Sequence, residues 1–198
     1  MNISVIGTGY VGLVTGTCFA ETGNNVTCVD IDENKINMLK NGKPPIYEPG
    51  LEELIKTNLQ EDRLSFTTSL ADAMQTAELV FIAVGTPTRR GDGHADLQYV
   101  YAAAEEIAGY LDHYTVIVDK STVPVGTARQ VHRIISTTNP DADFDVASNP
   151  EFLREGSAIN DALNPSRVII GVNSKKAEKI LKKAHQKLKN PVIMTSPQ

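Results

Sequence analysis

The chain contains no tryptophan, only two cysteines and only four histidines among its 198 residues. Two cysteines are too few for a scaffold held by disulfides, and Cys18 and Cys28 have no cysteine or histidine partner at metal-ligand spacing. The histidines form no triad-like spacing with an acid and a nucleophile. We therefore predict two buried, reduced thiols, no metal site and no hydrolase triad.

An excess of positive charge and a long apolar run are also missing. The formal net charge is −5, which argues against a surface that follows a nucleic-acid backbone. No apolar run approaches the length of a membrane span, and the start, MNISVIG, lacks the regions of an export signal. We therefore expect no nucleic-acid partner, no membrane partner and a cytoplasmic location.

Apolar runs alternate with helical stretches along the whole chain. Most runs are solid Val, Ile, Leu and Phe, as strands are when helices cover both faces of a parallel sheet. The predicted strands are residues 3–6, 26–31, 64–67, 79–84, 116–118, 144–147, 168–172 and 192–194, of which 64–67 is the weakest. The predicted helices are residues 11–22, 34–41, 51–59, 70–76, 97–111, 124–137 and 175–188. The pattern predicts one α/β domain over residues 1–198, with a doubly wound, mostly parallel sheet.

A glycine-rich turn joins the first predicted strand to the first predicted helix. Its string GTGYVG places Gly7, Gly9 and Gly12 where a tight turn, a close pyrophosphate and close helix–strand packing require them. Asp30 ends the next predicted strand, where its carboxylate can accept ribose hydroxyls and repel the extra phosphate of NADP. The pattern predicts a Rossmann fold that binds NAD. The alternative is that the glycines serve only strand–helix packing.

Polar residues follow other predicted strands at the same edge. Gly85 and Thr86 follow one strand in VGTPT, and Thr122 follows another in KSTVPVGT. Ligands of open α/β sheets bind outside the carboxyl ends of the strands, so these residues are candidates for cofactor contact. Lys35 could reach the same ribose as Asp30, or it could be solvated on its helix.

Two of these features also have a purely structural interpretation. Thr122, or Ser121 before it, could be only the N-cap of a helix entered through Pro124. In NPEFLREG, Asn149 could cap a short helix that places Glu151 and Glu155 on one face. On spacing alone, such a capped helix with a surface ion pair is as well supported as a binding site.

Seven strings together resemble the N-terminal, NAD-binding part of the UDP-glucose/GDP-mannose dehydrogenase family. They cover almost the whole chain in order, and STVPVGT and NPEFLREG are far more specific than the glycine motif. The strings are GTGYVGLV, VDID, PIYEPGLEEL, FIAVGTP, DG with ADL, KSTVPVGT and NPEFLREGSAI.

The resemblance implies roles for individual residues. It implies NAD contacts for Gly7, Gly9, Tyr10, Val11, Gly12, Asp30, Lys35, Gly85, Thr86, Thr122 and Glu155. It implies a nucleotide-sugar site lined by Glu151, Phe152, Leu153, Arg154 and Glu155. Glu151 would be a catalytic residue that positions or activates water, with Thr122 as a second catalytic residue hydrogen-bonded nearby.

The family oxidises a sugar alcohol twice with NAD, through an aldehyde trapped by a cysteine. The resemblance places that cysteine in a Gly-x-Cys-x-Pro-Lys-Asp motif and a catalytic lysine on a long central helix, and neither motif occurs before Gln198. We therefore expect an excised cofactor domain that binds NAD but is inactive alone, from an enzyme that dimerises through that helix.

The substrate that the resemblance favours is UDP-glucose, with GDP-mannose or a UDP-N-acetylhexosamine as alternatives. An alternative of another class is a stand-alone NAD-binding regulatory module, in which the missing catalytic groups are genuine absences.

Overall fold

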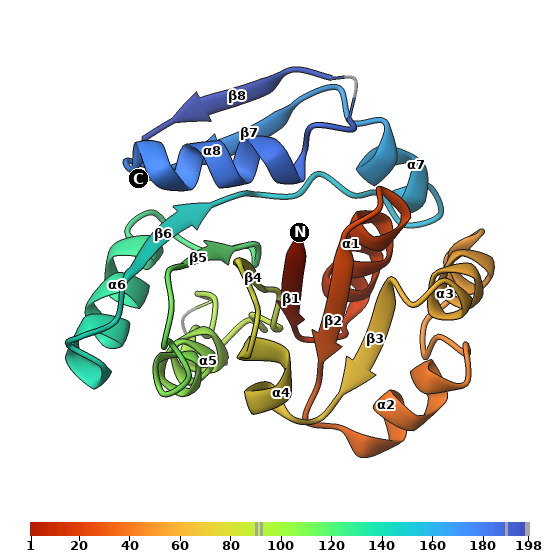
Figure 1. The fold of residues 1–198 in the computed structure, drawn as a ribbon, viewed down its shortest axis with the longest axis horizontal. Helices are drawn as coiled ribbons and strands as arrows, with labels where there is room; N and C mark the ends of the chain where they lie inside the picture. Colours follow the sequence, from red (N-terminus) through yellow and green to blue (C-terminus); the bar gives the residue numbers. More distant parts are fainter. Residues whose placement is uncertain (90, 92, 189, 197–198) are drawn as a thin grey trace.

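One sheet of eight strands runs through the molecule in the order β3-β2-β1-β4-β5-β6-β7-β8 (Figure 1). The computed structural model describes residues 1–89, 91, 93–188 and 190–196. Strands β1 to β6 are parallel, β7 is antiparallel to β6, and β8 is parallel to β7. The strands are β1 (Asn2–Ile6), β2 (Asn25–Val29), β3 (Leu64–Thr67), β4 (Leu79–Ile82), β5 (Thr115–Asp119), β6 (Phe144–Ser148), β7 (Val168–Gly171) and β8 (Val192–Thr195). The predicted doubly wound, mostly parallel sheet is confirmed.

Helices cover both faces of this sheet. They are α1 (Tyr10–Glu21), α2 (Glu33–Lys40), α3 (Leu51–Gln60), α4 (Leu70–Met74), α5 (Gln98–Ala108), α6 (Thr127–Thr138), α7 (Ala158–Leu163) and α8 (Lys175–Ala184). One core cluster joins the sheet to α1, α2, α3 and α8, and a second joins it to α4, α5 and α6. Because both faces are covered, the central strands β4 and β5 are buried throughout, which explains their solid apolar sequence.

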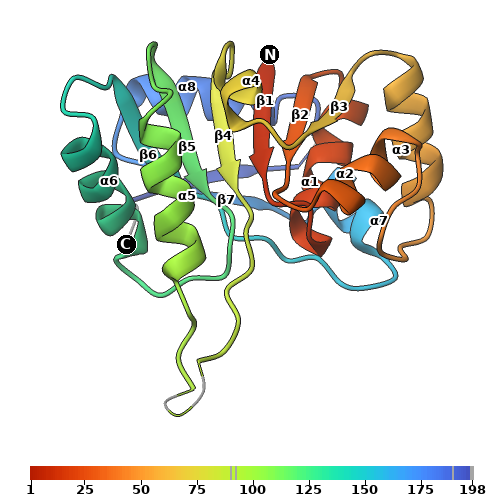
Figure 2. The ribbon, with the colours of Figure 1, turned by 90° about the horizontal axis from the view of Figure 1, so that it is seen from below.

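The carboxyl ends of β1 to β6 meet at one edge, the lower edge in Figure 2. The direction of the strand order reverses between β1 and β4, so this edge contains the topological switch point at which such sheets bind ligands. The connection from β4 to α5 projects beyond the edge (Figure 2), and its arms pair through Thr88 and Ala95. Asp92, in the DG string of the family resemblance, lies outside the described residues.

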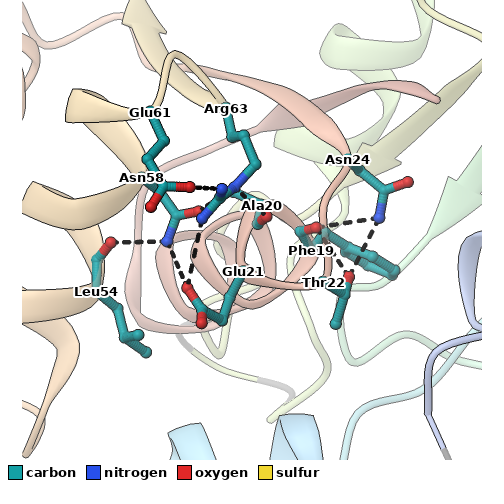
Figure 3. A network of polar contacts seen from close by, with 9 residues as sticks. All are labelled: Phe19, Ala20, Glu21, Thr22, Asn24, Leu54, Asn58, Glu61 and Arg63. Carbon is teal, nitrogen blue, oxygen red and sulfur yellow. Dashed lines mark hydrogen bonds and ion pairs between the residues drawn. The ribbon is translucent and has the colours of Figure 1, made fainter.

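The opposite edge holds a polar network around the C-terminal end of α1 (Figure 3). The Asn58 amide donates to Glu21 and to the Leu54 carbonyl, at 2.9 and 2.8 Å. Arg63 Nε donates to the Ala20 carbonyl at 3.1 Å and to Asn58 Oδ1 at 2.9 Å. These contacts fasten the end of α1 to α3 and β3, whereas the start of α1 faces the switch point.

Several predicted boundaries were wrong. The second strand ends at Val29, and Ile31 is 93% exposed beyond it. The predicted start of a helix at Pro124 is also wrong, because α6 begins at Thr127 with Gly126 as its N-cap. Neither Ser121 nor Thr122 caps that helix: the Ser121 hydroxyl donates to the carbonyls of Ile82 and Val84, which hold it against β4.

The lysine-rich helix α8 packs one apolar stripe, made of Ala177, Leu181 and Ala184, against the core. Its lysines lie on the other face, as shown by the 89% and 52% exposure of Lys175 and Lys182. In the part of the chain that the structure describes, no helix combines the length and apolarity needed to cross a membrane.

Candidate functional site

The turn between β1 and α1 contains glycines with two different structural requirements. Gly7 has φ of +101°, and a Cβ there would lie 2.7 Å from the Ala83 carbonyl oxygen. A Cβ on Gly12 would lie 2.0 Å from the Gly7 carbonyl oxygen. A Cβ on Gly9 would meet nothing within 4 Å. The fold itself therefore requires Gly7 and Gly12, whereas Gly9 keeps open a space in front of the helix.

That open space lies at the N-terminal end of α1. Gly9 is the N-cap, and no side chain among the described residues caps the helix. The free amides at the start of a helix and its dipole favour an anionic group such as a phosphate. The amides of Tyr10 and Val11 belong to this first turn. The turn therefore fits the pyrophosphate of a dinucleotide.

Asp30 follows β2 beside this turn. Its Oδ2 accepts hydrogen bonds from the Thr8 amide at 2.9 Å and the Thr8 hydroxyl at 2.6 Å, and its Oδ1 accepts one from the Asp32 amide at 3.1 Å. Lys35 Nζ lies 3.6 Å from Oδ2. Burial acts to raise the pKa of Asp30, but the bonds from Thr8 and Asp32 together with Lys35 hold it below its usual value. The carboxylate is ionised at neutral pH and retains acceptor capacity for ribose hydroxyls.

Thr86 and Thr122 come together at the edge. The Thr86 hydroxyl donates to the Thr122 carbonyl at 3.1 Å, which joins the loops that follow β4 and β5. Gly85 precedes Thr86 in the first of these loops, and a Cβ there would meet nothing within 4 Å. In the described part of the chain, no hydrogen bond joins Thr122 to Glu151, so the pairing implied by the family resemblance stays a prediction.

The connection from β6 to α7, residues 149–157, which we call the β6–α7 corner, corrects a further prediction. Asn149 does not cap a helix, because its amide group donates to the Ile169 carbonyl at 2.8 Å and its Oδ1 accepts from Lys120 at 2.9 Å. Glu151 Oε2 accepts from the Leu153 amide at 2.6 Å. The side chains are thus used within a nonhelical corner, and the helix begins only at Ala158.

The remaining corner residues differ in their surroundings. Phe152 is 60% exposed, whereas Leu153 packs against the core. Arg154 forms an exposed pair with Asp161, with Nη2 and Oδ1 2.7 Å apart, and this pairing raises the pKa of Arg154. Glu155 is exposed. Phe152 and Glu155 therefore project into solvent, where a ligand can reach them.

A cavity of about 390 Å³ lies behind the corner, between α1, α7 and the end of α8. Lys120 and Glu151 both line it. Burial lowers the pKa of Lys120 to about 8 and that of His185 to about 4, and it raises the pKa of Cys18 to about 12. The imidazole and the thiol are therefore neutral at pH 7, and neither is prepared for catalysis.

Sequence reasoning missed Glu48, which is 4% exposed. Its Oε2 accepts from the Tyr10 hydroxyl at 2.5 Å and from the Gly156 amide at 2.8 Å, and its Oε1 accepts from the Ala158 amide at 2.9 Å. The signal available was the Gly- and Pro-rich loop 41–50, a candidate for gripping a ligand. Nothing local indicated that its one internal acid reaches residues more than a hundred positions away.

The predicted state of the cysteines is confirmed, since Cys18 and Cys28 are both free and buried. Burial raises the pKa of Cys28, like that of Cys18, to about 12. Among the described residues there is no group of three His, Cys, Asp or Glu side chains that could hold a metal ion.

The reversed strand order, the open glycine turn and the ionised acid after β2 define a Rossmann-type dinucleotide-binding domain. The profile described as "UDP-glucose/GDP-mannose dehydrogenase family, NAD binding domain" matches residues 1–189, and the chain belongs to this family, whose cofactor is NAD.

Relatives and solved structures agree with that membership. The chain is 54% identical over 201 residues to UDP-glucose 6-dehydrogenase of Rhizobium meliloti, covering 99% of this chain and 46% of the relative. It is similar to a UDP-glucose dehydrogenase from Pyrobaculum islandicum, with 40% identity, a TM-score of 0.94 and coverage of 98% and 46%. It is also similar to a GDP-mannose dehydrogenase from Pseudomonas aeruginosa, with 36% identity, a TM-score of 0.95 and coverage of 100% and 47%. The chain spans about half the length of these proteins.

Proposed function

We propose that this chain binds NAD at the carboxyl edge of its sheet and is the cofactor-binding part of a longer dehydrogenase that oxidises UDP-glucose to UDP-glucuronate. The observation that carries the proposal is the open space at Gly9, in front of an uncapped helix end and beside the ionised Asp30. The chain's own packing gives no reason for a glycine at position 9. A phosphate that must approach the backbone closely explains why a residue without a side chain is needed there.

The residues have separate tasks in this proposal. The amides of Tyr10 and Val11 receive phosphate, Asp30 and Lys35 receive the adenosine ribose, and Gly85, Thr86 and Thr122 line the edge further along. Glu155 lies where the cofactor and substrate sites meet. NAD, when bound, supplies the acceptor for the hydride of the sugar alcohol.

The substrate would lie against the β6–α7 corner. Glu151 positions or activates the water that releases the product acid, with Thr122 nearby, and the residues from Phe152 to Glu155 line the nucleotide-sugar site. UDP-glucose is the first candidate because a relative with 54% identity is named UDP-glucose 6-dehydrogenase. GDP-mannose is the second, because a structure with 36% identity is a GDP-mannose dehydrogenase. UDP-N-acetyl-mannosamine dehydrogenases are less similar, at 27% identity for Cap5O of Staphylococcus aureus.

The second oxidation in this chemistry needs a thiolate. Cys18 and Cys28 do not supply one, because burial raises both pKa values to about 12. We therefore propose that the 198-residue chain alone forms no NADH in repeated turnovers with UDP-glucose. Steady multiple turnover by the purified chain would contradict this.

Two expectations accompany the proposal. We propose that the longer protein is a homodimer, because the family resemblance assigns it a central dimer-forming helix. We also propose that it acts in the cytoplasm, where NAD and nucleotide sugars are available. Analytical ultracentrifugation of the longer protein and fractionation of the cells would test these.

The decisive experiment is a calorimetric titration with NAD of the chain and of two glycine variants. Gly9→Ala adds a methyl group that meets no protein atom within 4 Å, and Gly109→Ala adds one at the end of α5 with only an ordinary contact of 3.4 Å. Both variants should fold as the wild type does. We expect Gly9→Ala to weaken NAD binding at least about tenfold, which is ~1.4 kcal/mol, and Gly109→Ala to leave it unchanged. Equal NAD affinity in all three proteins would refute the proposal.

A further inference from the structure

Glu48 is held in place by the start of α3 on one side and by the packing of Ile46 on the other. Its backbone carbonyl accepts from the Leu51 amide at 3.1 Å, at the start of α3. Ile46, two residues earlier, packs against the core, while Tyr47 between them is 88% exposed. The loop 41–50 therefore carries one buried acid at a fixed position, although its neighbour in sequence faces solvent.

The carboxylate of Glu48 is the common acceptor for two distant segments. Tyr10 is the first residue of α1, and Gly156 and Ala158 lie where the β6–α7 corner enters α7. Oε2 alone accepts from both Tyr10 and Gly156, at 2.5 and 2.8 Å. The helix that faces the cofactor and the corner that faces the substrate are thus bonded to the same side chain.

Charge makes this junction strong. Burial acts to raise the pKa of Glu48, but the hydrogen bonds from Tyr10, Gly156 and Ala158 hold it below its usual value. Burial and the adjacent Glu48 carboxylate raise the pKa of Tyr10, so its hydroxyl stays protonated and remains a donor. Hydrogen bonds to an ionised acceptor are roughly twice as strong as bonds between neutral groups.

A purely structural role for Glu48 would be to cap α7. The local sequence, however, already offers a residue that could cap this helix. Ser157 occupies the N-cap position of α7 and makes no side-chain cap bond. The acceptor instead comes from Glu48, 110 positions away along the chain from Ala158. A local serine cap would satisfy the helix end, but it would not connect the corner to Tyr10.

We propose that Glu48 is a positioning residue that joins the cofactor turn to the substrate-facing corner, so that NAD bound at the start of α1 orders residues 151–158. The inference rests on the proposed NAD site. NAD held by the amides of the first turn restrains Tyr10, and the Tyr10–Glu48 bond passes the restraint to the amides of Gly156 and Ala158. In the longer enzyme, the corner would then be ordered before the nucleotide sugar binds.

The test is amide hydrogen exchange of the chain, with and without saturating NAD, followed at Tyr10–Val11 and at Gly156–Ala158. In the wild type, NAD should slow exchange at both places, by about tenfold at the corner, which is ~1.4 kcal/mol. In Glu48→Gln, exchange at the corner should be faster without NAD, and NAD should slow exchange only at Tyr10–Val11.

The matched control is Glu53→Gln, which removes the same charge from an exposed position in the first turn of α3. It should behave as the wild type does. Tyr10→Phe removes the hydroxyl that donates to Glu48 at 2.5 Å, together with its longer contact of 3.5 Å to the Arg154 carbonyl, and leaves the carboxylate to bind the corner amides. It should therefore abolish the NAD response at the corner without accelerating basal exchange as much as Glu48→Gln does. If Glu48→Gln fails to fold, Tyr10→Phe carries the test.

The outcomes separate this inference from the proposed function. Protection at Tyr10–Val11 without protection at Gly156–Ala158 in the wild type overturns the role of Glu48 and leaves the NAD site standing. An equal NAD response at the corner in the wild type and in both variants also overturns it, because Glu48 would then be only a cap. No protection anywhere in the wild type overturns both proposals.

Discussion

Two regions at the carboxyl edge bury a carboxylate, and their surroundings are opposite. Glu48 is 4% exposed and accepts three hydrogen bonds, from Tyr10, Gly156 and Ala158. Asp119, at the end of β5, is 2% exposed, and neither of its oxygens accepts a hydrogen bond from the described residues. The Ser121 amide close to it donates to the Ile82 carbonyl instead.

The two acids therefore differ in charge at neutral pH. The bonds around Glu48 outweigh burial and lower its pKa, whereas burial raises the pKa of Asp119 to about 7. Lys120, the next residue, is affected in the complementary way, since burial lowers its pKa to about 8. Hydrogen-bond donors can therefore outweigh the effect of burial and keep an acid ionised, as at Glu48, whereas burial without donors favours the protonated form, as at Asp119.

The largest effect should come from breaking the well-bonded region. Glu48→Ala leaves the amides of Gly156 and Ala158 and the Tyr10 hydroxyl without their acceptor, so we expect a loss of about 2–3 kcal/mol in the free energy of unfolding. Urea unfolding at pH 7 measures it. Glu53→Ala, at an exposed position, should change stability by less than ~0.5 kcal/mol. A loss in Glu48→Ala no greater than in this control would show that water replaces the carboxylate.

The second effect concerns Asp119, whose carboxylate accepts no hydrogen bond from the described residues. The pKa of Asp119 is higher in the folded chain, about 7, than the ordinary value of 3.8, so the folded state binds the extra proton between these values. This contribution to stability is present below about pH 4 and is lost as the pH rises through 7. At pH 8, the free energy of unfolding of Asp119→Asn, measured with urea, should therefore be about 1–2 kcal/mol higher than that of the wild type. Near pH 4 this difference should disappear.

The control for that pH profile is Asp141→Asn, which removes an exposed carboxylate from the connection between α6 and β6. It should leave the shape of the stability profile unchanged. If Asp119→Asn and the wild type have parallel profiles from pH 4 to 8, the carboxyl group of Asp119 has found donors and the comparison fails.

A third effect has the opposite sign and tests Lys120. Its pKa falls from 10.5 to about 8 on folding, so the unfolded chain binds the extra proton between these values and stability rises with pH across that window. We expect the free energy of unfolding of Lys120→Met to rise by about 1 kcal/mol less than that of the wild type across this pH window. Lys179→Met, at an exposed position of α8, should retain the rise. The measurement is the urea midpoint from pH 7.5 to 10.5, and a rise of the same size in Lys120→Met would contradict the burial of the charge.

The smallest effect concerns an intermediate case, Asp30, whose carboxylate is bonded by Thr8 but lies close to solvent. Its partner Lys35 is 40% exposed and 3.6 Å away, so solvent weakens their attraction. Lys35→Met should lower stability by no more than ~0.5 kcal/mol, and 1 M salt should remove the difference. A larger, salt-resistant loss would place Asp30 with Glu48 among the strongly coupled acids.

The sequence predicted the alternation of strands and helices, because solid apolar runs and glycine stops have local causes. Gly23 and Gly42, for example, have positive φ and follow the ends of α1 and α2, where glycine commonly stops a helix. The sequence also predicted which strand ends meet at one edge, since parallel strands present the same ends together. It failed at Asn149, where capping chemistry was plausible but the side chain is used by Lys120 and Ile169. The competing partners come from β5 and β7, and no local pattern identifies them.

The sequence by itself determined the Rossmann sheet, the glycine turn and the acid after β2, because each follows from neighbouring residues or from the spacing of apolar runs. Only the tertiary structure decided which buried groups are charged. Glu48 is an anion at neutral pH, whereas Asp119 titrates near pH 7, because of the donors that folding brings, or fails to bring, within hydrogen-bond distance. The donors to Glu48 come from residues far away in the chain.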